Sequence, residues 1–257
     1  MIVYGLLFHG SALAVDAQHE LPKLTEQPDD LLVSQVGNTR WLARHIDADD
    51  VPFGYQLTPM RNMLTRWNQT QFERAARAFQ LLDWRRTHQY CGCCGTSMQR
   101  HPTGEMAQLC PNANCNHSAY PRISPCVIVA IRRDDTLLLA RAQRYTTPMF
   151  SLIAGFVEVG ETLEQAVHRE VLEEVGIHIT NLQYINSQPW PFPSNLMIGY
   201  TADYLSGELV LQADEIAEAA YFHIDQLPLI PPSGSIAHSL IDQTIQAIRA
   251  NQTATSV

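Results

Sequence analysis

Three glutamates within five residues are the part of this sequence with the clearest potential for chemistry. Glu170, Glu173 and Glu174 lie in a stretch, 163–175, whose apolar residues recur at helical spacing. Residues four apart meet on successive turns of a helix, so Glu170 and Glu174 would lie side by side. Like charges at that spacing repel, and they repel more strongly where solvent is excluded. The alternative is a solvated acidic face that Arg169, four residues before Glu173, partly neutralises.

The helix that holds these glutamates has recognisable ends. Thr162 and Gln165 fit a capping box, in which each side chain satisfies a free backbone N–H. Gly176 fits a C-terminal cap, because glycine adopts the left-handed conformation at little cost. The apolar residues expected to face a core are Leu163, Ala166, Val167 and Val171.

The residues around this helix also match a complete sequence motif. From Gly155 to Ile177 the chain reads GFVEVGETLEQAVHREVLEEVGI. It fills every fixed position of the pattern GX5EX7REUXEEXGU, where U is a bulky aliphatic residue. This pattern is the Nudix box, and a match over its full length is specific. The chain therefore resembles the Nudix hydrolases.

Composition limits the remaining possibilities. The chain has 257 residues, of which 46% are hydrophobic and 17% charged, as in globular proteins. Its formal net charge of −9 argues against broad nucleic-acid binding, which depends on Lys and Arg. No apolar run reaches the roughly 18 residues that span a bilayer. The first residues superficially resemble a signal peptide but contain no basic residue before Lys23, so a cytoplasmic location is expected.

The N-terminal part of the chain reads as a small β-rich domain over 1–87. A helix is expected at its end, over about 71–86, with Thr70 and Glu73 as its capping box. Prolines and glycines separate short apolar runs before that helix. The strands expected there are 2–8, 31–36 and 40–46.

Two cysteine pairs follow, with the spacing of a metal site. Cys91-x2-Cys94 and Cys110-x4-Cys115 are separated by a short loop. Four thiolates on two tight turns can complete a closed tetrahedral Zn²⁺ site, whose role would be structural. The longer second gap and the neighbouring Cys93 depart from the usual pattern, and disulfides are the alternative in an oxidising compartment. The sequence predicts a zinc ribbon over 88–122.

From residue 123 the pattern changes to α/β structure, which predicts a hydrolase domain over 123–250. A last helix is expected over about 235–249, and residues 251–257 read as a disordered tail. The expected strands are 126–131, 136–142, 150–154, 178–185, 195–205, 208–212 and 219–224.

A proline-rich loop at 187–195, SQPWPFPSN, stands apart from these elements. Its prolines pre-set the backbone, so Trp190 and Phe192 would be held in place. A rigid aromatic pair can stack on an adenine or nicotinamide ring. The same aromatics could instead plug the core, and the sequence leaves both interpretations open.

Together, the box, the cysteine module and SQPWPFP resemble the Nudix NADH pyrophosphatases of the NudC type, over about residues 85–250. That group's marker is SQPWPFPxS, and here Asn195 replaces the closing serine. The resemblance implies an α+β protein, in which a zinc ribbon and an N-terminal β-rich domain precede an α/β/α sandwich with a mixed sheet. It also implies a homodimer that hydrolyses NADH or NAD⁺ to AMP and nicotinamide mononucleotide. Bacterial members also remove NAD caps from RNA.

The resemblance also assigns roles to residues of this chain. Catalysis would use Glu170, Glu173 and Glu174. Mg²⁺ or Mn²⁺ would bind the Ala154 carbonyl, Glu170, Glu174 and Glu215, and zinc would bind Cys91, Cys94, Cys110 and Cys115. Substrate contacts would come from Glu105, Tyr120, Gln188, Pro189, Trp190, Pro191, Phe192, Pro193, Ser194, Asn195 and Ala237, with an arginine near position 61. The divalent ions would lower the pKa of an attacking water, whose proton a box glutamate accepts.

Two other functions compete with this interpretation. Within enzymes, the alternative is another Nudix activity, such as hydrolysis of ADP-ribose or a diadenosine polyphosphate. From a different class, the zinc ribbon could make this a nucleic-acid-binding protein with a vestigial hydrolase domain. The intact box and the acidic net charge argue against that class.

Overall fold

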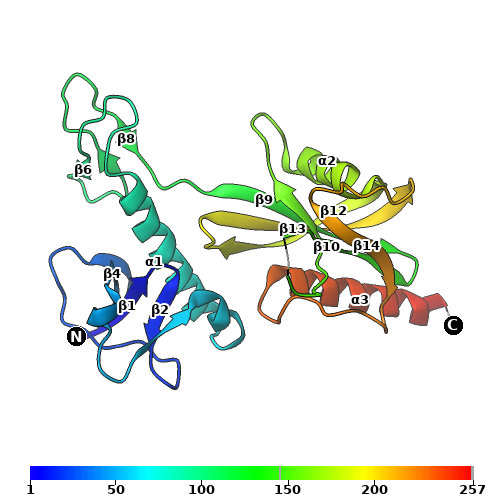
Figure 1. Cartoon of the computed structure of the whole chain (residues 1–257), viewed down its shortest axis with the longest axis horizontal. Helices are drawn as coiled ribbons and strands as arrows, with labels where there is room; N and C mark the ends of the chain where they lie inside the picture. The colour runs from blue at the N-terminus through cyan, green and yellow to red at the C-terminus, as the bar shows by residue number, and fades with distance from the viewer. Residues whose placement is uncertain (145, 256–257) are drawn as a thin grey trace. The chain divides into compact units, whose positions relative to one another are not determined.

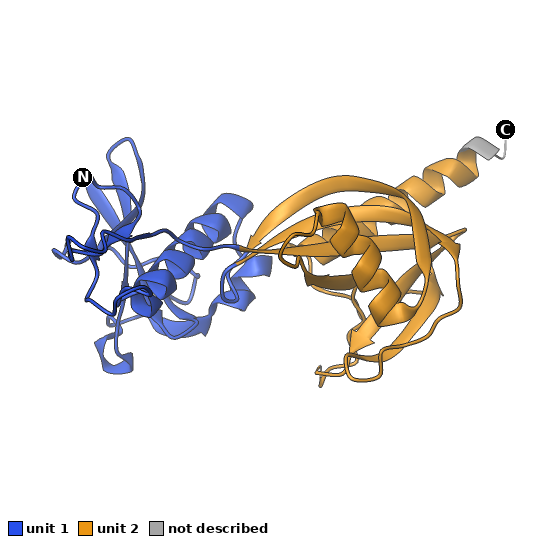
Figure 2. Cartoon of the chain, turned by 90° about the horizontal axis from the view of Figure 1, so that it is seen from above, with its two compact units in different colours: residues 1–123, 190–194 blue, residues 124–189, 195–257 orange. Residues whose placement is uncertain are grey.

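The computed structural model describes residues 1–144 and 146–255, which form two compact units (Figure 2). Unit 1 comprises Met1–Ile123 together with Trp190–Ser194, and unit 2 comprises the rest of the chain. The proline-rich loop is thus divided, because its aromatic part belongs to unit 1.

Unit 1 is built on a five-stranded sheet in the order β3-β4-β1-β2-β5. The three predicted strands are confirmed, while β2 and β5 have only four residues each and escaped prediction. Two short 3-10 helices, Ala48–Asp50 and Met60–Thr65, flank β5. The strands are β1 Ile2–His9, β2 Ala12–Val15, β3 Leu31–Val36, β4 Thr39–His45 and β5 Gln56–Pro59.

Helix α1, Gln69–Thr87, packs its apolar face on this sheet and forms the core of unit 1 with it. The capping box predicted at Thr70 and Glu73 is wrong. Asn68 is the N-cap: its side chain accepts from the Gln71 N–H at 2.9 Å, and the Gln71 side chain accepts from the Asn68 N–H at 3.2 Å. Asparagine is a stronger N-cap than threonine, which places the helix start two residues earlier.

The cysteine module of unit 1 contains three two-residue strands in the order β6-β7-β8. They are β6 Gln99–Arg100, β7 Gln108–Leu109 and β8 Ser118–Ala119. Such short strands supply few backbone hydrogen bonds, and Met106 of the module also packs on the core of unit 1.

Unit 2 is a six-stranded mixed sheet (Figure 1). Its order is β12-β13-β9-β10-β14, and β11 pairs with β9. The β9–β13 pair is parallel, whereas β9 is antiparallel to β10 and β11. The strands are β9 Ser124–Arg133, β10 Thr136–Ala142, β11 Ile153–Phe156, β12 His178–Trp190, β13 Asn195–Ser206 and β14 Ile216–His223.

Two helices cover opposite faces of this sheet, namely α2 Leu163–Val175 and α3 Ile236–Thr255. Successive side chains of a strand point to opposite faces. Val127 and Val129 of β9 accordingly pack in the core under α2, whereas Ile128 and Ala130 pack in the core under α3. This is the predicted α/β/α sandwich, and the α+β fold class is confirmed.

Two predicted features of unit 2 are wrong. Residues 208–212 do not form a strand: the Val210 and Gln212 N–H groups bond to the carbonyls of Val175 and Glu174 at the end of α2. The sequence also predicts disorder from Asn251, but α3 continues to Thr255. No glycine or proline follows Arg249 to end the helix; residues 256–257 lie outside the described part.

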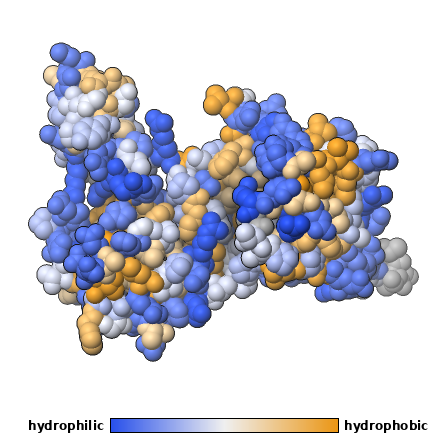
Figure 3. All heavy atoms as spheres, viewed as in Figure 1, coloured by the Kyte–Doolittle hydropathy of each residue, from blue (hydrophilic) through white to orange (hydrophobic). Residues whose placement is uncertain are grey.

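On the face seen in Figure 3, hydrophilic residues cover much of the surface and apolar residues form scattered groups. Among the described helices, none combines the length and the apolar character needed to cross a bilayer.

Candidate active site and cysteine cluster

The helix that holds the glutamates has the predicted ends. The Thr162 hydroxyl accepts from the Gln165 N–H at 3.2 Å, and the Gln165 side chain accepts from the Thr162 N–H at 2.8 Å. Gly176 ends the helix with a φ of 75°. The apolar stripe faces the core under α2, and Glu174 is buried on that same side, whereas Glu170 is partly exposed and Glu173 is exposed.

Arg169 is the centre of a network that ties the box together. Its guanidinium donates to both carboxylate oxygens of Glu161, at 2.8 and 2.9 Å. It also reaches Glu170 at 2.8 Å, Glu173 at 3.0 Å and the Phe156 carbonyl at 2.9 Å. Hydrogen bonds from Arg169 hold the pKa of Glu161 below its usual range. The acidic run is therefore an ordered network, in which one cation fixes three carboxylates.

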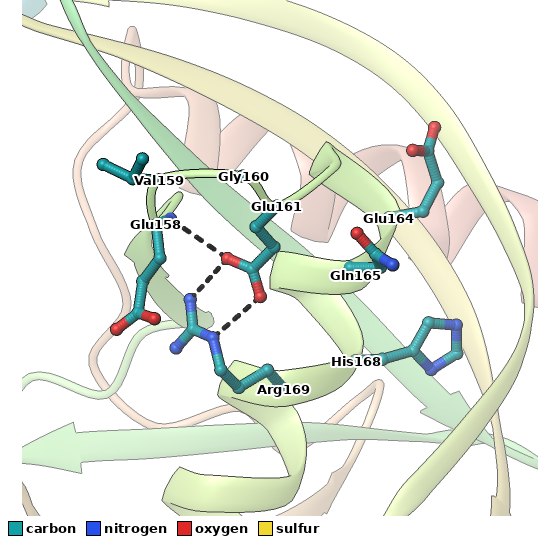
Figure 4. A pocket seen from close by; sticks show the side chains of 8 residues that line it. All are labelled: Glu158, Val159, Gly160, Glu161, Glu164, Gln165, His168 and Arg169. Atoms are coloured by element: carbon teal, nitrogen blue, oxygen red, sulfur yellow. Dashed lines mark hydrogen bonds and ion pairs between the residues drawn. The ribbon is translucent and has the colours of Figure 1, made fainter.

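A shallow hollow of about 570 Å³ opens where the loop enters α2 (Figure 4). Glu161 lies at its centre and connects the Arg169 guanidinium to the Glu158 backbone N–H, which it accepts at 3.0 Å. The hollow is lined by Glu158, Val159, Gly160, Glu161, Glu164, Gln165, His168 and Arg169. Because neither Glu170 nor Glu174 lines it, the hollow marks the supporting side of the box.

Glu174 is the most perturbed carboxyl group of the site. The residue is only 6% exposed, and no hydrogen bond to its carboxyl group occurs among the described residues. Burial, followed by the nearby charges of Glu170 and Glu215, raises its pKa to about 8. Burial likewise raises the pKa of Glu170, although Arg169 opposes the shift. These shifts bring Glu170, Glu174 and Glu215 into one electrostatic cluster, as expected for shared metal ligands.

Gly155 has a steric reason to be glycine. A Cβ atom at this position would lie 1.9 Å from the Glu170 carboxyl carbon, so the backbone of β11 and this carboxylate share one space. Ala154, the proposed carbonyl ligand, is the preceding residue of the same strand. Oxygen donors crowded around a buried carboxylate fit Mg²⁺ or Mn²⁺, which prefer oxygen ligands.

Sequence reasoning missed two residues near the glutamates. Cys126 of β9 is buried opposite Phe156, and burial, with Glu170 and Glu174 nearby, raises its pKa to about 12. Gln212 donates to Glu215 at 3.4 Å, while its own N–H bonds to the Glu174 carbonyl. Neither residue has a motif spacing, because the folding of distant segments brings both to the site.

Two predicted substrate contacts in unit 2 have other partners. Gln188 donates to the Gly234 carbonyl at 2.8 Å and accepts from the Ile236 N–H at 2.8 Å, so it caps the start of α3. Ala237 is 6% exposed and packs in the core under α3. Asn195 begins β13, where it is the register partner of Ser124.

The loop aromatics lie in unit 1, with an arginine over them. Trp190 and Phe192 meet edge to face at 5.3 Å, and both are half-buried against the core of unit 1. The Arg61 guanidinium lies 4.4 Å from the Phe192 ring centre and 5.6 Å from that of Trp190. The two rings thus pack on the core, as one interpretation holds, and form a cation–aromatic cluster with Arg61, while stacking on a ligand ring stays a prediction.

Two further predicted contacts, Glu105 and Tyr120, come together in the cysteine module. The Tyr120 hydroxyl donates to Glu105 at 3.2 Å, and this bond raises the pKa of Tyr120. The Tyr120 ring is 55% exposed, so it remains available for stacking.

The four predicted zinc ligands gather in one place. The sulfur atoms of Cys91, Cys94, Cys110 and Cys115 all lie within 4.8 Å of one another. Cys91 and Cys115 are 3.7 Å apart, and Cys94 and Cys110 are 3.5 Å apart. Tetrahedral zinc with bonds of about 2.3 Å needs sulfur atoms about 3.8 Å apart, so the cluster fits. Cys93 is exposed and outside the cluster.

Comparisons with known proteins identify the family. The NUDIX domain family matches residues 122–243. The NAD-capped RNA hydrolase NudC of Escherichia coli O1:K1 is 51% identical over 179 residues, which cover 70% of this chain and 68% of that protein. The chain belongs to the NudC family of Nudix hydrolases. Among solved structures, a NUDIX hydrolase from Nitrosomonas europaea is 21% identical to this chain, with a TM-score of 0.49. The match covers 64% of this chain and 93% of the Nitrosomonas chain.

Proposed function

We propose that this protein hydrolyses the pyrophosphate bond of NAD(H) to AMP and nicotinamide mononucleotide, and removes the same group from NAD-capped RNA. The main support is the buried Glu174 carboxyl group of an intact Nudix box, which lies close enough to Glu170 and to Glu215 outside the box for their charges to raise its pKa. The 51% identity to a protein named as an NAD-capped RNA hydrolase supports the substrate class.

The residues of the box have separable roles in this proposal. Glu170, Glu174, Glu215 and the Ala154 carbonyl would hold Mg²⁺ or Mn²⁺. These ions would neutralise the pyrophosphate and lower the pKa of the attacking water. A box glutamate accepts the proton of that water. Arg169 positions Glu170 through its 2.8 Å bond and is itself fixed by Glu161.

Substrate selection would come from outside the box. Metals and pyrophosphate are common to all Nudix substrates, so the glutamates cannot distinguish NADH from ADP-ribose. Aromatic side chains can, because the nicotinamide ring of NADH gains stacking energy where ADP-ribose has only a bare ribose. Trp190, Phe192 and Tyr120 are the proposed selecting residues, with Glu105 and Arg61 as their polar neighbours.

The cysteine cluster would bind one structural zinc ion. Its support is the geometry, since four sulfur atoms within 4.8 Å of one another can all bind one zinc ion as thiolates. Four sulfur ligands leave no open position for catalysis. Reduced thiolates suit the cytoplasmic location proposed for the protein, and the resemblance to its family suggests a homodimer, which light scattering after gel filtration would test.

Product analysis tests the function directly. NADH, NAD⁺, ADP-ribose and an NAD-capped RNA are incubated side by side with Mg²⁺ or Mn²⁺, and products are separated by chromatography. The proposal requires AMP and nicotinamide mononucleotide from NADH, and loss of activity in EDTA. Efficient hydrolysis of ADP-ribose with NADH left intact would contradict it.

A further inference from the structure

The acidic net charge of this protein is confined to unit 2. Unit 1 contains eleven of the seventeen Lys and Arg residues and eleven of the twenty-six Asp and Glu residues. Unit 1 is therefore formally neutral, and unit 2 has the entire charge of −9. The argument from net charge against binding a polyanion does not apply to unit 1.

Three arginines of unit 1 lie along one side of α1, and a fourth lies on β6. Arg74 Nε donates to the Ser34 hydroxyl at 3.0 Å, and Arg77 Nε donates to the Val33 carbonyl at 3.3 Å. Arg85 lies further along the same side of the helix. It follows Arg77 by eight residues, and Arg77 follows Arg74 by three, so the three side chains are within one broad face. With an arginine of β6 they form the arginine row, defined as Arg74, Arg77, Arg85 and Arg100.

The last two members of the arginine row lie close together. Burial and the neighbouring Arg100 charge lower the pKa of Arg85, while Asp29 opposes the shift. Arg100 also donates to the Asp29 carbonyl at 3.1 Å and to its carboxylate at 3.4 Å. The Asp29 side chain is fully exposed, so the carboxylate that pairs with Arg100 is solvated.

Most of this positive charge has no anionic partner. Among the described residues, no carboxylate oxygen lies within 4.0 Å of the guanidinium of Arg74, Arg77 or Arg85, whereas Arg86 is 2.7 Å from Asp83. A guanidinium has five N–H donors in a planar fork that matches phosphate. The bonds to Ser34 and Val33 use one donor each, so the remaining donors and the charge are available to a phosphate.

Sealing of the sheet edge is an alternative role for part of the row. Val33 sits where the β3–β4 register shifts, and Arg77 satisfies its carbonyl there. That role accounts for Arg74 and Arg77, which contact β3, but not for Arg85 and Arg100. A surface for a polyanion accounts for all four.

We propose that the arginine row binds the phosphate backbone of the RNA that follows an NAD cap. This inference rests on the proposed function, because it requires capped RNA to be a substrate. Positions 74 to 85 span about 16 Å of helix, enough for several phosphates of a single strand. The aromatic ring in contact with the row, Trp41, already stacks on Tyr4 and under Arg74. The row therefore offers phosphate contacts and not base stacking, so binding is salt-dependent and independent of base sequence.

The test compares a triple variant, Arg77→Gln with Arg85→Gln and Arg100→Gln, with the single variant Arg86→Gln. Arg86 adjoins Arg85 in sequence but is paired with Asp83 on another side of the helix, so it controls for the loss of one arginine outside the row. Arg74 stays unchanged because it packs on Trp41. Substrates are NADH, a capped dinucleotide, and two capped RNAs of different sequence that exceed the roughly 4–16 nucleotides single-strand sites cover.

The triple variant should lose on the order of tenfold in kcat/KM for both long RNAs at low salt, with NADH and the dinucleotide unchanged. Three lost contacts should also reduce the slope of log affinity against log salt by about 2. Equal behaviour of the triple variant and Arg86→Gln would overturn the inference. The inference would also be overturned if the wild-type protein bound an acidic peptide at the arginine row but hydrolysed long capped RNA no better than the capped dinucleotide.

Failure of the proposed function gives a different result. In that case wild-type protein turns over neither NADH nor any capped RNA. Anisotropy of a fluorescent single-stranded RNA then tests the row without catalysis. Binding that the triple variant loses would keep the RNA surface and refute only the reaction, and equal binding by both proteins would refute the surface.

Discussion

Without metal, the Glu174→Gln variant should gain stability relative to the wild-type protein as the pH rises. With metal, the variant should have lost its activity. The Glu174 carboxyl group has a pKa of about 8 in the folded protein, against a usual value of 4.5. The folded state therefore binds more protons than the unfolded state between these pH values. By linkage, the contribution of this group to stability is present at low pH and is lost between about pH 4.5 and pH 8.

The size of the effect follows from the pKa shift. A shift of one unit corresponds to about 1.36 kcal/mol, so the full shift gives a ceiling of about 5 kcal/mol. Relaxation and water entry around the ionised group reduce this to about 2–5 kcal/mol. Glutamine keeps the size without the ionisation, and any cost of burying its amide does not depend on pH. The difference in unfolding free energy between variant and wild type should thus grow by about 2–5 kcal/mol from pH 5 to pH 9.

Urea unfolding in EDTA at several pH values measures this difference, since other titrating groups are common to both proteins. Glu164→Gln is the matched control: it removes an exposed carboxylate from the same helix and should stay within about 0.5 kcal/mol at every pH. Saturating Mn²⁺ should stabilise wild type most at high pH and the Glu174→Gln variant much less. A difference that is constant from pH 5 to pH 9 would refute the reasoning that Glu174 is a desolvated carboxyl group.

Further variants test the cysteine cluster and the proline-rich loop. Cys110→Ser should remove the single tightly bound zinc ion and lower stability by several kcal/mol, whereas Cys93→Ser should do neither. Metal analysis of both variants measures this. A zinc-free wild-type protein that is folded and active would refute the zinc site. Trp190→Ala and Phe192→Ala should each lower kcat/KM for NADH by about 5- to 150-fold, the equivalent of one lost stack of roughly 1–3 kcal/mol. Their affinity for Mn²⁺ should not change, and an unaltered preference for NADH over ADP-ribose would make the loop a packing element only.

Features of this structure that depend on residues close together in the sequence could be predicted. Thr162, Gln165 and Gly176 define the ends of α2 through bonds within one or two turns, so their residue types suffice. The cysteine cluster was also predictable, because two short turns leave four sulfur atoms few other arrangements. Where two caps compete, as Asn68 and Thr70 do, the choice depends on small energy differences that the pattern does not contain.

Long-range hydrogen bonds account for what could not be predicted. Residues 208–212 alternate like a strand, yet their N–H groups satisfy the last carbonyls of α2, including that of Glu174. Glu174, whose pKa burial raises, has this segment bonded to its backbone carbonyl and Cys126 of β9 within reach of its charge, and neither adjoins it in sequence. Gln188 illustrates the same limit, because its position in the marker sequence suggests a ligand contact while its amide caps α3.

Hydrolysis of NADH in ¹⁸O-labelled water, followed by mass spectrometry of the products, tests the central claim most directly. Attack of water on the pyrophosphate predicts AMP and nicotinamide mononucleotide, with one ¹⁸O atom in the phosphate of one product. The label should disappear with EDTA and with Glu174→Gln. Release of free nicotinamide with no label in any phosphate would contradict the account, and so would full activity in the absence of divalent metal.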